Sequence, residues 1–395
     1  MAAEPAVVAL LQAAMRRRLI TKERAVDMAE GLVGCGENPV ELRRLLAGSP
    51  DREAIMLREL LPADDLAPIG GWQRLACLGE GRTASSWLGI GASRQLVVIK
   101  VIHANRVPAG AEADRFKDEA RELVGLGSRY LVDYQEARRG ADGRAVLVTE
   151  YVPGRDLQAR SSTKGPMAEA KALPLLRQAA KGLHVLDHHG RCHGMLHPGN
   201  ILVSGDGRAR LSDYGMVMSA TRHGLRPGWD ARSLLLHAWA APETVSGAAV
   251  PTPASDQYAL ACIAYWLLSG QPPFAGTPDE QALKHQTAPR PDVRALAPKV
   301  SGHTAMAIGK AMAIDPSERF ISALAFANAL HRSYSILVGA VTADAPVELT
   351  PTGGVAVVDA PAPKPADIEV AFADDGLAGL SGRHVVRRRP RRRRR

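Results

Sequence analysis

Cysteine is scarce in this sequence: the 395 residues include four, and none of them forms a Cys-x-x-Cys pair or a Cys/His group at zinc spacing. A small disulfide scaffold is therefore excluded, and we expect reduced, buried thiols. Long apolar runs are also missing, because the longest in a helical pattern, residues 259–268, is about half of the ~20 residues that a membrane span requires. With no secretory leader pattern either, the sequence predicts no membrane span and a cytoplasmic location.

A net positive charge is lacking outside one short segment. The formal net charge is +9 at pH 7, and residues 383–395 contain nine arginines and no acid, so the preceding residues sum to zero. Binding of nucleic acid or another polyanion would therefore depend on this tail rather than on a basic folded surface. Residues 342–382 carry seven acids and one lysine, and an alternative is that they fold back onto the arginines and mask them.

Composition and patterning divide the chain into four parts. Residues 1–66 have apolar residues at helical spacing, among them Val7 and Leu11, and predict a helical module of unknown role. Residues 72–333 begin with strand patterns and become mostly helical after residue 166, which predicts the folded body. Residues 336–382 are rich in Pro, Ala and Gly and predict a disordered acidic linker, and residues 383–395 are the Arg-rich tail.

Two signals in the strand-rich part indicate chemistry. The first is a glycine-rich turn in residues 78–87, where Gly79 and Gly81 would let main-chain N–H groups approach a phosphate. The second is Lys100 among β-branched residues, because a buried ammonium needs an anion. Glu119, nineteen residues later in a helical pattern, is a candidate for that anion. Each signal alone is also typical of an ordinary turn or an edge strand.

Further motifs follow in a fixed order. They are Thr-Glu-Tyr-Val-Pro-Gly at residues 149–154, His-Gly-Met-Leu-His-Pro-Gly-Asn at 193–200, Asp-Tyr-Gly at 213–215, Ala-Pro-Glu at 241–243, Asp256 at the start of an apolar run, and Arg319. With the glycine-rich turn and the strand lysine, this order and spacing resemble a protein kinase domain of the bacterial Ser/Thr type. The resemblance covers about residues 72–333.

The resemblance implies an α+β, bilobal protein-kinase-like fold with a small antiparallel β lobe and a large helical lobe. It implies ATP and Mg²⁺ as cofactors, with Lys100 holding the α- and β-phosphates while paired with Glu119. The residues that it assigns to ATP are Leu78, Gly79, Gly81, Ser86, Val98, Lys100, Glu119, Glu150 and Val152. The residues that it assigns to the metal are Asn200 and Asp213, and those with a structural role are Glu243, Asp256 and Arg319.

The departures from the family pattern cluster on the acceptor side of the site. Met195 stands where the family has the Asp that accepts the proton of the substrate hydroxyl, and a thioether cannot be a general base. His197 replaces the Lys that touches the transferring phosphate, and His193 is a neighbouring imidazole. Gly194 and Leu236 replace an Arg and a Thr of the same network. We therefore assign no catalytic residue with this pattern, and the sequence predicts a pseudokinase.

Three functional interpretations remain open. The first is an ATP- and Mg²⁺-binding signalling regulator that is catalytically impaired and docks unknown protein partners. Its nucleotide binding is expected to be weak, because Val98 is larger than the usual Ala beside adenine. The second is a slow or atypical Ser/Thr kinase, although Asp206, the nearest alternative carboxylate, lies in a hairpin-turn signal and is no substitute base. The third is polyanion or nucleic-acid binding through the Arg-rich tail.

Overall fold

The computed structural model describes residues 5–16, 68–216 apart from Arg94, 238–245 and 250–337, together with Ile20, Ala25 and Met28. The chain divides into two compact units. The first includes residues 1–80 and 86–98, and the second includes residues 81–85 and 99–371. The boundary therefore passes through strand β3 (Leu96–Ile102).

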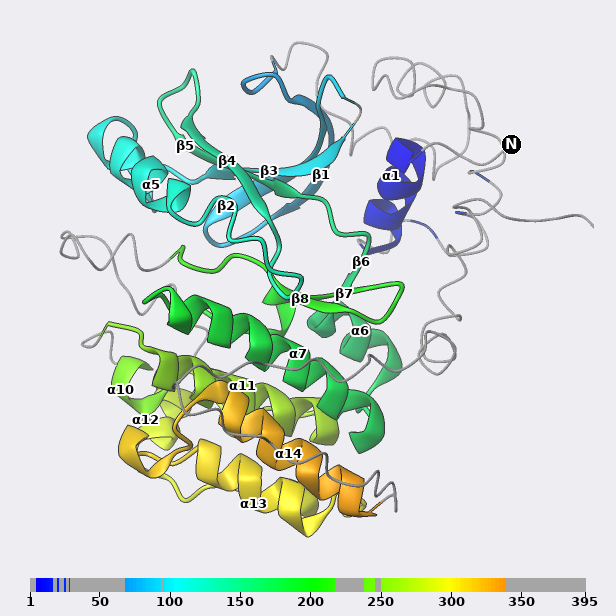
Figure 1. Ribbon diagram of the computed structural model, residues 1–395, viewed down its shortest axis with the longest axis vertical. Helices are drawn as coiled ribbons and strands as arrows, with labels where there is room; N and C mark the ends of the chain where they lie inside the picture. The colour runs from blue at the N-terminus through cyan, green and yellow to red at the C-terminus, as the bar shows by residue number, and fades with distance from the viewer. Residues whose placement is uncertain are drawn as a thin grey trace, which may run out of the picture. The chain divides into compact units, whose positions relative to one another are not determined.

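The first unit contains helix α1 (Pro5–Arg16), strand β1 (Gln73–Glu80) and most of strand β2 (Ala84–Ile90). Val7, Leu10, Leu11 and Ala14 of α1 lie at helical spacing and are buried, with Val7 and Leu11 at 0% exposure. α1 contacts β1 (Figure 1), and burial of these side chains stabilises the helix by removing apolar surface from water. The remainder of the predicted helical module lies outside the described residues except for three single positions.

Five strands form one sheet in the order β1-β2-β3-β5-β4 (Figure 1). Strands β4 (Tyr134–Arg139) and β5 (Ala145–Glu150) are an antiparallel pair. Helix α5 (Ala111–Arg121) packs against both of them and buries Phe116, with Ala113 and Ala120 one turn to either side. The predicted β lobe with a single helix is confirmed, and Lys100 and Glu119 lie on β3 and α5 as expected.

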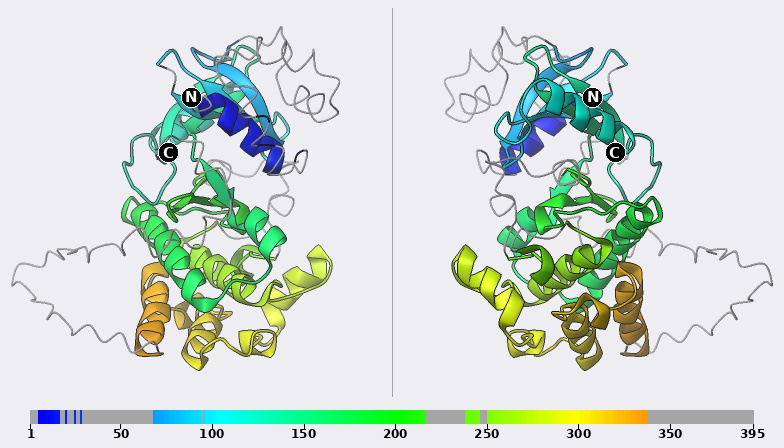
Figure 2. Two further views of the ribbon diagram at one scale, coloured as in Figure 1. Left: turned by 90° about the vertical axis from the view of Figure 1, so that its right-hand side faces the viewer. Right: turned by 90° about the vertical axis from the view of Figure 1, so that its left-hand side faces the viewer.

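The second unit continues into a helical part. Its helices are α6 (Leu157–Lys164), α7 (Glu169–His188), α10 (Pro242–Val245), α11 (Pro253–Ser269), α12 (Pro278–Thr287), α13 (Gly302–Ala311) and α14 (Ala323–Leu337), with the short 3₁₀ helices η1 (Pro198–Asn200), η2 (Val293–Ala295) and η3 (Pro316–Glu318). Helix α11 is the centre of this part, since residues 255–265 are all buried. Helices α7, α13 and α14 contact it (Figure 2), which confirms the predicted helical lobe.

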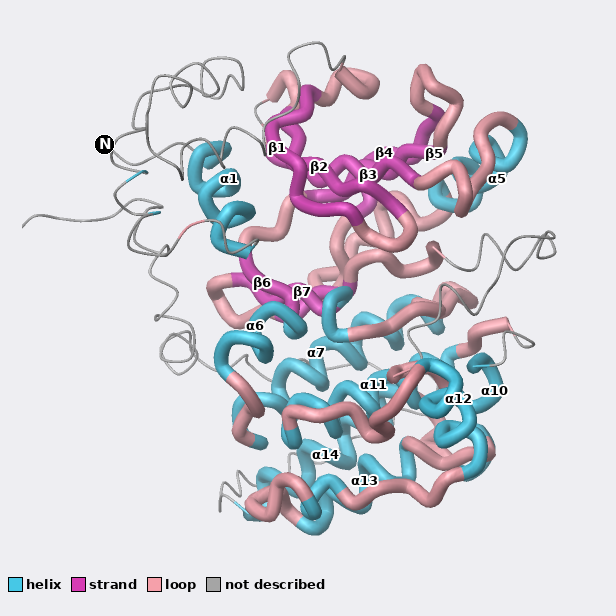
Figure 3. Tube along the Cα trace, turned by 180° about the vertical axis from the view of Figure 1, so that it is seen from behind, coloured by secondary structure: helices cyan, strands magenta, loops and turns pink. Residues whose placement is uncertain are grey.

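A second, three-stranded sheet contains β6 (Gly154–Asp156), β7 (Ile201–Ser204) and β8 (Ala209–Leu211) in that order. Helix α6 lies beside β6 and β7 (Figure 3). Asp206 is in the turn of the β7–β8 hairpin and pairs with Arg208, so the hairpin predicted there is present. This hairpin places Asn200 immediately before β7 and Asp213 two residues after β8.

None of the helices in the described ranges is long and apolar enough to cross a lipid bilayer. The three cysteines within these ranges are thiols that form no disulfide: Cys192 and Cys262 are buried, whereas Cys77 is half-buried rather than buried as expected.

Candidate functional site

The loop of residues 193–200 is held by the carboxylate of Asp256 at the start of α11. Asp256 Oδ2 accepts the N–H of His193 at 2.6 Å, and Oδ1 accepts the N–H of Gly194 at 2.9 Å. Burial raises the pKa of Asp256 to about 7, although the two main-chain donors act to lower it. Gly194 has a φ of 81°, a conformation that favours glycine. Main-chain contacts therefore fix the loop, whatever side chain stands at position 195.

Lys100 pairs with Asp213 in this structure. Its Nζ donates to Asp213 Oδ1. Glu119 lines a cavity together with Leu123 and Tyr214, and its pairing with Lys100 stays a prediction. Burial acts to raise the pKa of Asp213, but the charge and hydrogen bond of Lys100 lower it below its usual value. The Asp213 carboxylate is therefore ionised and carries a cation partner.

The backbone of Asp213 is unusual. Its φ of 61° makes it the non-glycine residue with positive φ among those described, and such positions often store strain at functional sites. The next residue, Tyr214, stacks on Tyr134 with ring centroids 4.3 Å apart. The Tyr134 hydroxyl donates to the Tyr214 carbonyl at 2.8 Å, and the Tyr214 hydroxyl donates to the Val132 carbonyl at 2.8 Å. The stacked rings and these two hydrogen bonds hold the Asp-Tyr-Gly segment. Tyr134 was not predicted as a site residue, because it belongs to none of the sequence motifs.

The tip of the glycine-rich turn is fixed to the segment after β3. Gly81 N donates to the Ala84 carbonyl at 2.9 Å and closes the turn. His103 Nε2 contacts the Gly81 carbonyl at 3.0 Å, and Arg106 Nε donates to the Arg82 carbonyl at 3.1 Å. A side chain added at Gly79 would meet no atom within 4 Å, so this glycine leaves open space where the sequence analysis places phosphate. Leu78 and Ser86 lie in β1 and β2, next to the turn.

The motif at residues 149–154 begins within the last two residues of β5, and the family resemblance assigns Glu150 and Val152 of this segment to ATP. The side chain of Glu150 accepts hydrogen bonds from Arg210 Nη1 at 2.8 Å and from the Asp133 main-chain N–H at 2.9 Å. Because the Glu150 carboxylate is already hydrogen-bonded to Arg210 and Asp133, only the main chain of Glu150 remains to bind a purine. Val152 is 6% exposed, and Val98 lies on β3.

Two imidazoles of the 193–200 loop are neutral. Burial lowers the pKa of His193 to about 4, and burial likewise lowers the pKa of His197 to about 4. The positive charges of Arg82 and Lys100 contribute to the second shift. His197 Nδ1 accepts the N–H of Gly199 at 3.1 Å. Position 197 therefore offers no cation at neutral pH, in contrast to a lysine.

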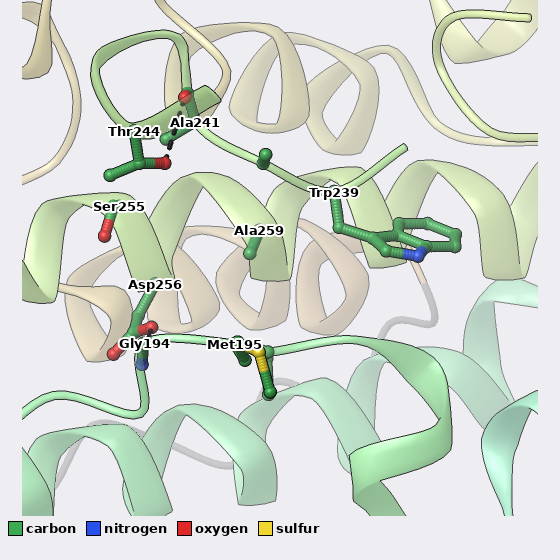
Figure 4. Close-up of a pocket in the computed structure, with 10 residues that line it drawn as sticks. Gly194, Met195, Trp239, Ala241, Thr244, Ser255, Asp256 and Ala259 are labelled. Carbon is green, nitrogen blue, oxygen red and sulfur yellow. Dashed lines mark hydrogen bonds between the residues drawn. The ribbon is translucent and has the colours of Figure 1, made fainter. Parts of the chain in front are cut away.

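Met195 lines an open pocket together with Trp239, Ala241, Ser255 and Asp256 (Figure 4). Trp239 also packs edge-on against Trp266, with centroids 5.7 Å apart. The Met195 thioether therefore lies in a pocket that has both apolar and polar walls. The activation-segment positions Leu236, Ser219 and Thr221 lie outside the described residues.

Magnesium fits the donor set of the site. Asn200 Nδ2 donates to the Met195 carbonyl at 3.2 Å, which leaves the Asn200 Oδ1 as an acceptor, and Asp213 supplies a carboxylate. Mg²⁺ prefers such hard oxygens and is commonly held by one or two protein groups plus substrate phosphates. Asn200 and Asp213 would hold the metal and Lys100 the phosphates, and the metal would supply charge neutralisation between phosphate oxygens.

A buried ion pair closes the base of the helical part. Arg319 Nη1 and Nη2 each donate to one oxygen of Glu243 at 2.8 Å, and Nη1 also donates to the Ala254 carbonyl. The Arg319 side chain is 0% exposed. Glu243 lies between Ala241 and Thr244, which line the Met195 pocket, so the pair ties that segment to α11 and the loop before α14.

The fold and the site together define a protein of the kinase class. Its features are a five-stranded sheet with helix α5, a helical part built on α11, and a loop held by Asp256 near Lys100 and Asp213. The family model described as "Protein kinase domain" matches residues 72–334, and the chain belongs to this family. Its domain is of the bacterial Ser/Thr kinase type.

Curated relatives are bacterial Ser/Thr protein kinases. The chain is 30% identical over 254 residues to drp72 of Corynebacterium efficiens, covering 62% of this chain and 47% of the relative. It is 33% identical over 294 residues to pkn2 of Myxococcus xanthus, covering 70% and 34% respectively. The matches thus span about a third to a half of these relatives. A structure of Rad53 1-466 in complex with AMP-PNP has the same fold, with a TM-score of 0.54, 19% identity, and coverage of 65% of this chain and 64% of that one.

Proposed function

We propose that this protein is an ATP- and Mg²⁺-binding signalling regulator of the protein kinase family whose phosphotransfer is impaired and which acts by docking protein partners. Lys100, Asn200 and Asp213 supply the groups that hold phosphates and metal. Support for nucleotide use also comes from the similarity to Ser/Thr kinases.

The observation that carries the proposal is the position of Met195. Its carbonyl accepts the N–H of the Asn200 amide at 3.2 Å, and its N–H contacts His193 Nδ1 at 3.4 Å. Its side chain is a thioether, and the carboxylate that lines the same pocket, Asp256, already accepts two main-chain N–H groups, so position 195 supplies no group to accept a hydroxyl proton. General-base catalysis contributes about 10²–10⁴-fold to such reactions, and its loss predicts a severe rate deficit.

One experiment tests both halves of the proposal. Purified full-length protein would be titrated with Mg²⁺-ATP by calorimetry and, in parallel, assayed for transfer of labelled γ-phosphate to itself and to generic Ser/Thr peptides. The proposal expects binding without ordinary turnover. Absence of binding at millimolar nucleotide would overturn the nucleotide half, and turnover at 1–100 s⁻¹ would overturn the impairment.

A second candidate, a slow or atypical Ser/Thr kinase, is favoured by the intact anchoring of the site. Asp256 holds the 193–200 loop through two main-chain N–H groups, and Lys100 and Asp213 are in contact. Phosphoryl transfer depends mainly on positioning and electrostatics, which these contacts can supply without a base. The same assay separates the candidates: turnover that is slow, saturable and lost in Asp213→Ala favours the second.

A further inference from the structure

Glu150, the last residue of β5, is bound through both its main chain and its side chain. Its N–H donates to the Asp133 carbonyl at 2.9 Å, and the Asp133 N–H donates to Glu150 Oε1 at 2.9 Å. Arg210 Nη1 donates to Glu150 Oε1 and Oε2, each at 2.8 Å. All three residues belong to the second compact unit. The position of the Glu150 main chain therefore depends on two other segments of that unit.

Arg210 makes this contact from β8, a strand that is fixed by main-chain hydrogen bonds on both edges. On one edge, Leu211 N donates to the Tyr130 carbonyl at 2.9 Å, and the Leu211 carbonyl accepts the Val132 N–H at 2.8 Å. On the other edge, β8 pairs with β7, where Arg210 lies opposite Leu202. The Arg210 guanidinium is therefore carried by a rigid support.

The ion pair of Arg210 and Glu150 is partly buried, with side-chain exposures of 22% and 28%. Hydrogen bonds between charged groups are strong, and removal from water strengthens them further. A second acid lies beside the pair, since burial and the charge of Glu150 both raise the pKa of Asp133. Without Arg210, the Glu150 carboxylate would retain the Asp133 N–H as a donor but would face the Asp133 carboxyl with no cation between them.

We propose that Arg210 is a positioning residue for the purine: through the Glu150 carboxylate it holds the main chain of residues 150–152 in the place where the purine binds. The inference rests on the proposed nucleotide binding and concerns the purine end of that site. Both carboxylate oxygens and the N–H of Glu150 are engaged, so the segment is preorganised and loses less conformational entropy when a ligand binds. Arg210 acts through Glu150 and makes no contact with the purine itself.

Titration of adenosine and of Mg²⁺-ATP into the full-length protein tests the role of Arg210. Calorimetry would be done at a temperature at which every variant is folded, so that a loss of stability alone leaves the affinities unchanged. Arg210→Met keeps an unbranched side chain and removes the guanidinium, and we expect it to weaken adenosine and ATP by the same factor, roughly tenfold. Arg210→Lys keeps the charge and should recover part of the affinity.

Two control variants define the effect. Arg208→Met, on the same hairpin, removes the exposed ion pair with Asp206 and should change neither affinity. Lys100→Ala should weaken ATP and leave adenosine unchanged, because it acts at the phosphates. In a Glu150→Gln background, Arg210→Met should cost less adenosine affinity than it costs in the wild type, because the ion pair is already gone.

Several outcomes would overturn the positioning role while leaving nucleotide binding intact. Equal adenosine affinities of the wild type and Arg210→Met would leave Arg210 a structural role only. A loss confined to ATP would place its effect at the phosphates, and a gain for adenosine would identify the ion pair as a restraint on the purine site. A wild type that binds Mg²⁺-ATP but not adenosine would also overturn it, because the purine end would then contribute no affinity. A wild type that binds neither ligand would instead overturn the proposed function, and the role of Arg210 with it.

Discussion

The nucleotide side and the acceptor side of the candidate site differ in whether they retain the charged and polar side chains of the family pattern. On the nucleotide side, Lys100 and Asp213 form an ion pair and Asn200 presents an amide oxygen. On the acceptor side, Met195 is apolar and His197 is neutral. The Asp256 carboxylate holds the loop that carries both, by accepting the main-chain N–H groups of His193 and Gly194. The Met195 side chain takes no part in these contacts, so position 195 can change without loss of this anchor, whereas the His197 ring accepts the Gly199 N–H and belongs to the hydrogen bonds of the loop.

Catalysis is where the two sides should differ most. With Met195 in place of a general base, we expect phosphotransfer to generic Ser/Thr peptides at least ~10³-fold below the ordinary 1–100 s⁻¹. The measurement is incorporation of labelled phosphate by protein free of contaminating kinases, with Asp213→Ala as the blank. Ordinary rates, with autophosphorylation at Ser219 or Thr221 as the first place to look, would contradict the prediction.

Restoring the acceptor side should recover part of this rate. The double change Met195→Asp with His197→Lys supplies a carboxylate and an ammonium at the two altered positions, and we expect measurable turnover because the loop is already held by Asp256. The single changes are the matched controls and should each recover less. If the double variant binds Mg²⁺-ATP as the wild type does and remains inactive, the deficit lies elsewhere in the site.

The next largest effect concerns the ion pair beneath the acceptor side. Glu243→Gln leaves the fully buried guanidinium of Arg319 without its counter-charge, and breaking such a pair costs about 3–5 kcal/mol of the free energy of unfolding. Urea denaturation would measure the loss. The control is Asp206→Asn, which removes the exposed pair with Arg208 and should cost under about 1 kcal/mol. Equal effects of both substitutions would contradict the prediction.

Most of the fold was predictable from the sequence, because it follows from motif order and local patterning. The antiparallel β lobe precedes the helical lobe, Glu119 lies on α5, and Asp256 lies near the start of the buried α11, as the patterns and the resemblance predict. The ion pair of Lys100 with Asp213 was not predicted, because only three-dimensional proximity brings these two motif residues together. The contacts of His103 and Arg106 with the glycine-rich turn were missed as well, because hydrogen bonds to main-chain carbonyls leave no pattern in the sequence.

The neutral His197 predicts a pH dependence of stability. Burial lowers its folded-state pKa to about 4 from the usual 6.5. The ring is therefore protonated at a lower pH in the folded state than in the unfolded chain. The contribution of the neutral His197 ring to the free energy of unfolding is fully present above pH 6.5. It is lost as the pH falls from 6.5 to 4, by up to about 1.4 kcal/mol per pH unit. His197→Gln should remove this part of the slope in urea titrations at several pH values, whereas His303→Gln, at an exposed position, should not.

Nucleotide should stabilise the fold by a smaller amount. At a hundred times its dissociation constant, Mg²⁺-ATP is expected to raise the free energy of unfolding by about 2.7 kcal/mol. Lys100→Ala and Asp213→Ala should abolish this rise, because each removes a group from the nucleotide side, whereas Met195→Leu should preserve it. Thermal melts with and without Mg²⁺-ATP measure the effect. A melting temperature that does not change with millimolar Mg²⁺-ATP would show that the nucleotide side does not bind the nucleotide.

The smallest effect tests the one substitution that weakens the nucleotide side. Val98 lies on β3 two residues before Lys100, where the family has an alanine against adenine. Val98→Ala removes two methyl groups and should widen the purine site. Because one CH₂ corresponds to about 0.8 kcal/mol of transfer free energy, we expect an affinity gain for ATP and adenosine alike of no more than about tenfold. Calorimetric titration of both ligands measures it. A gain confined to ATP would place the effect at the phosphates instead, and a loss of affinity would show that the Val98 methyl groups contact the purine favourably.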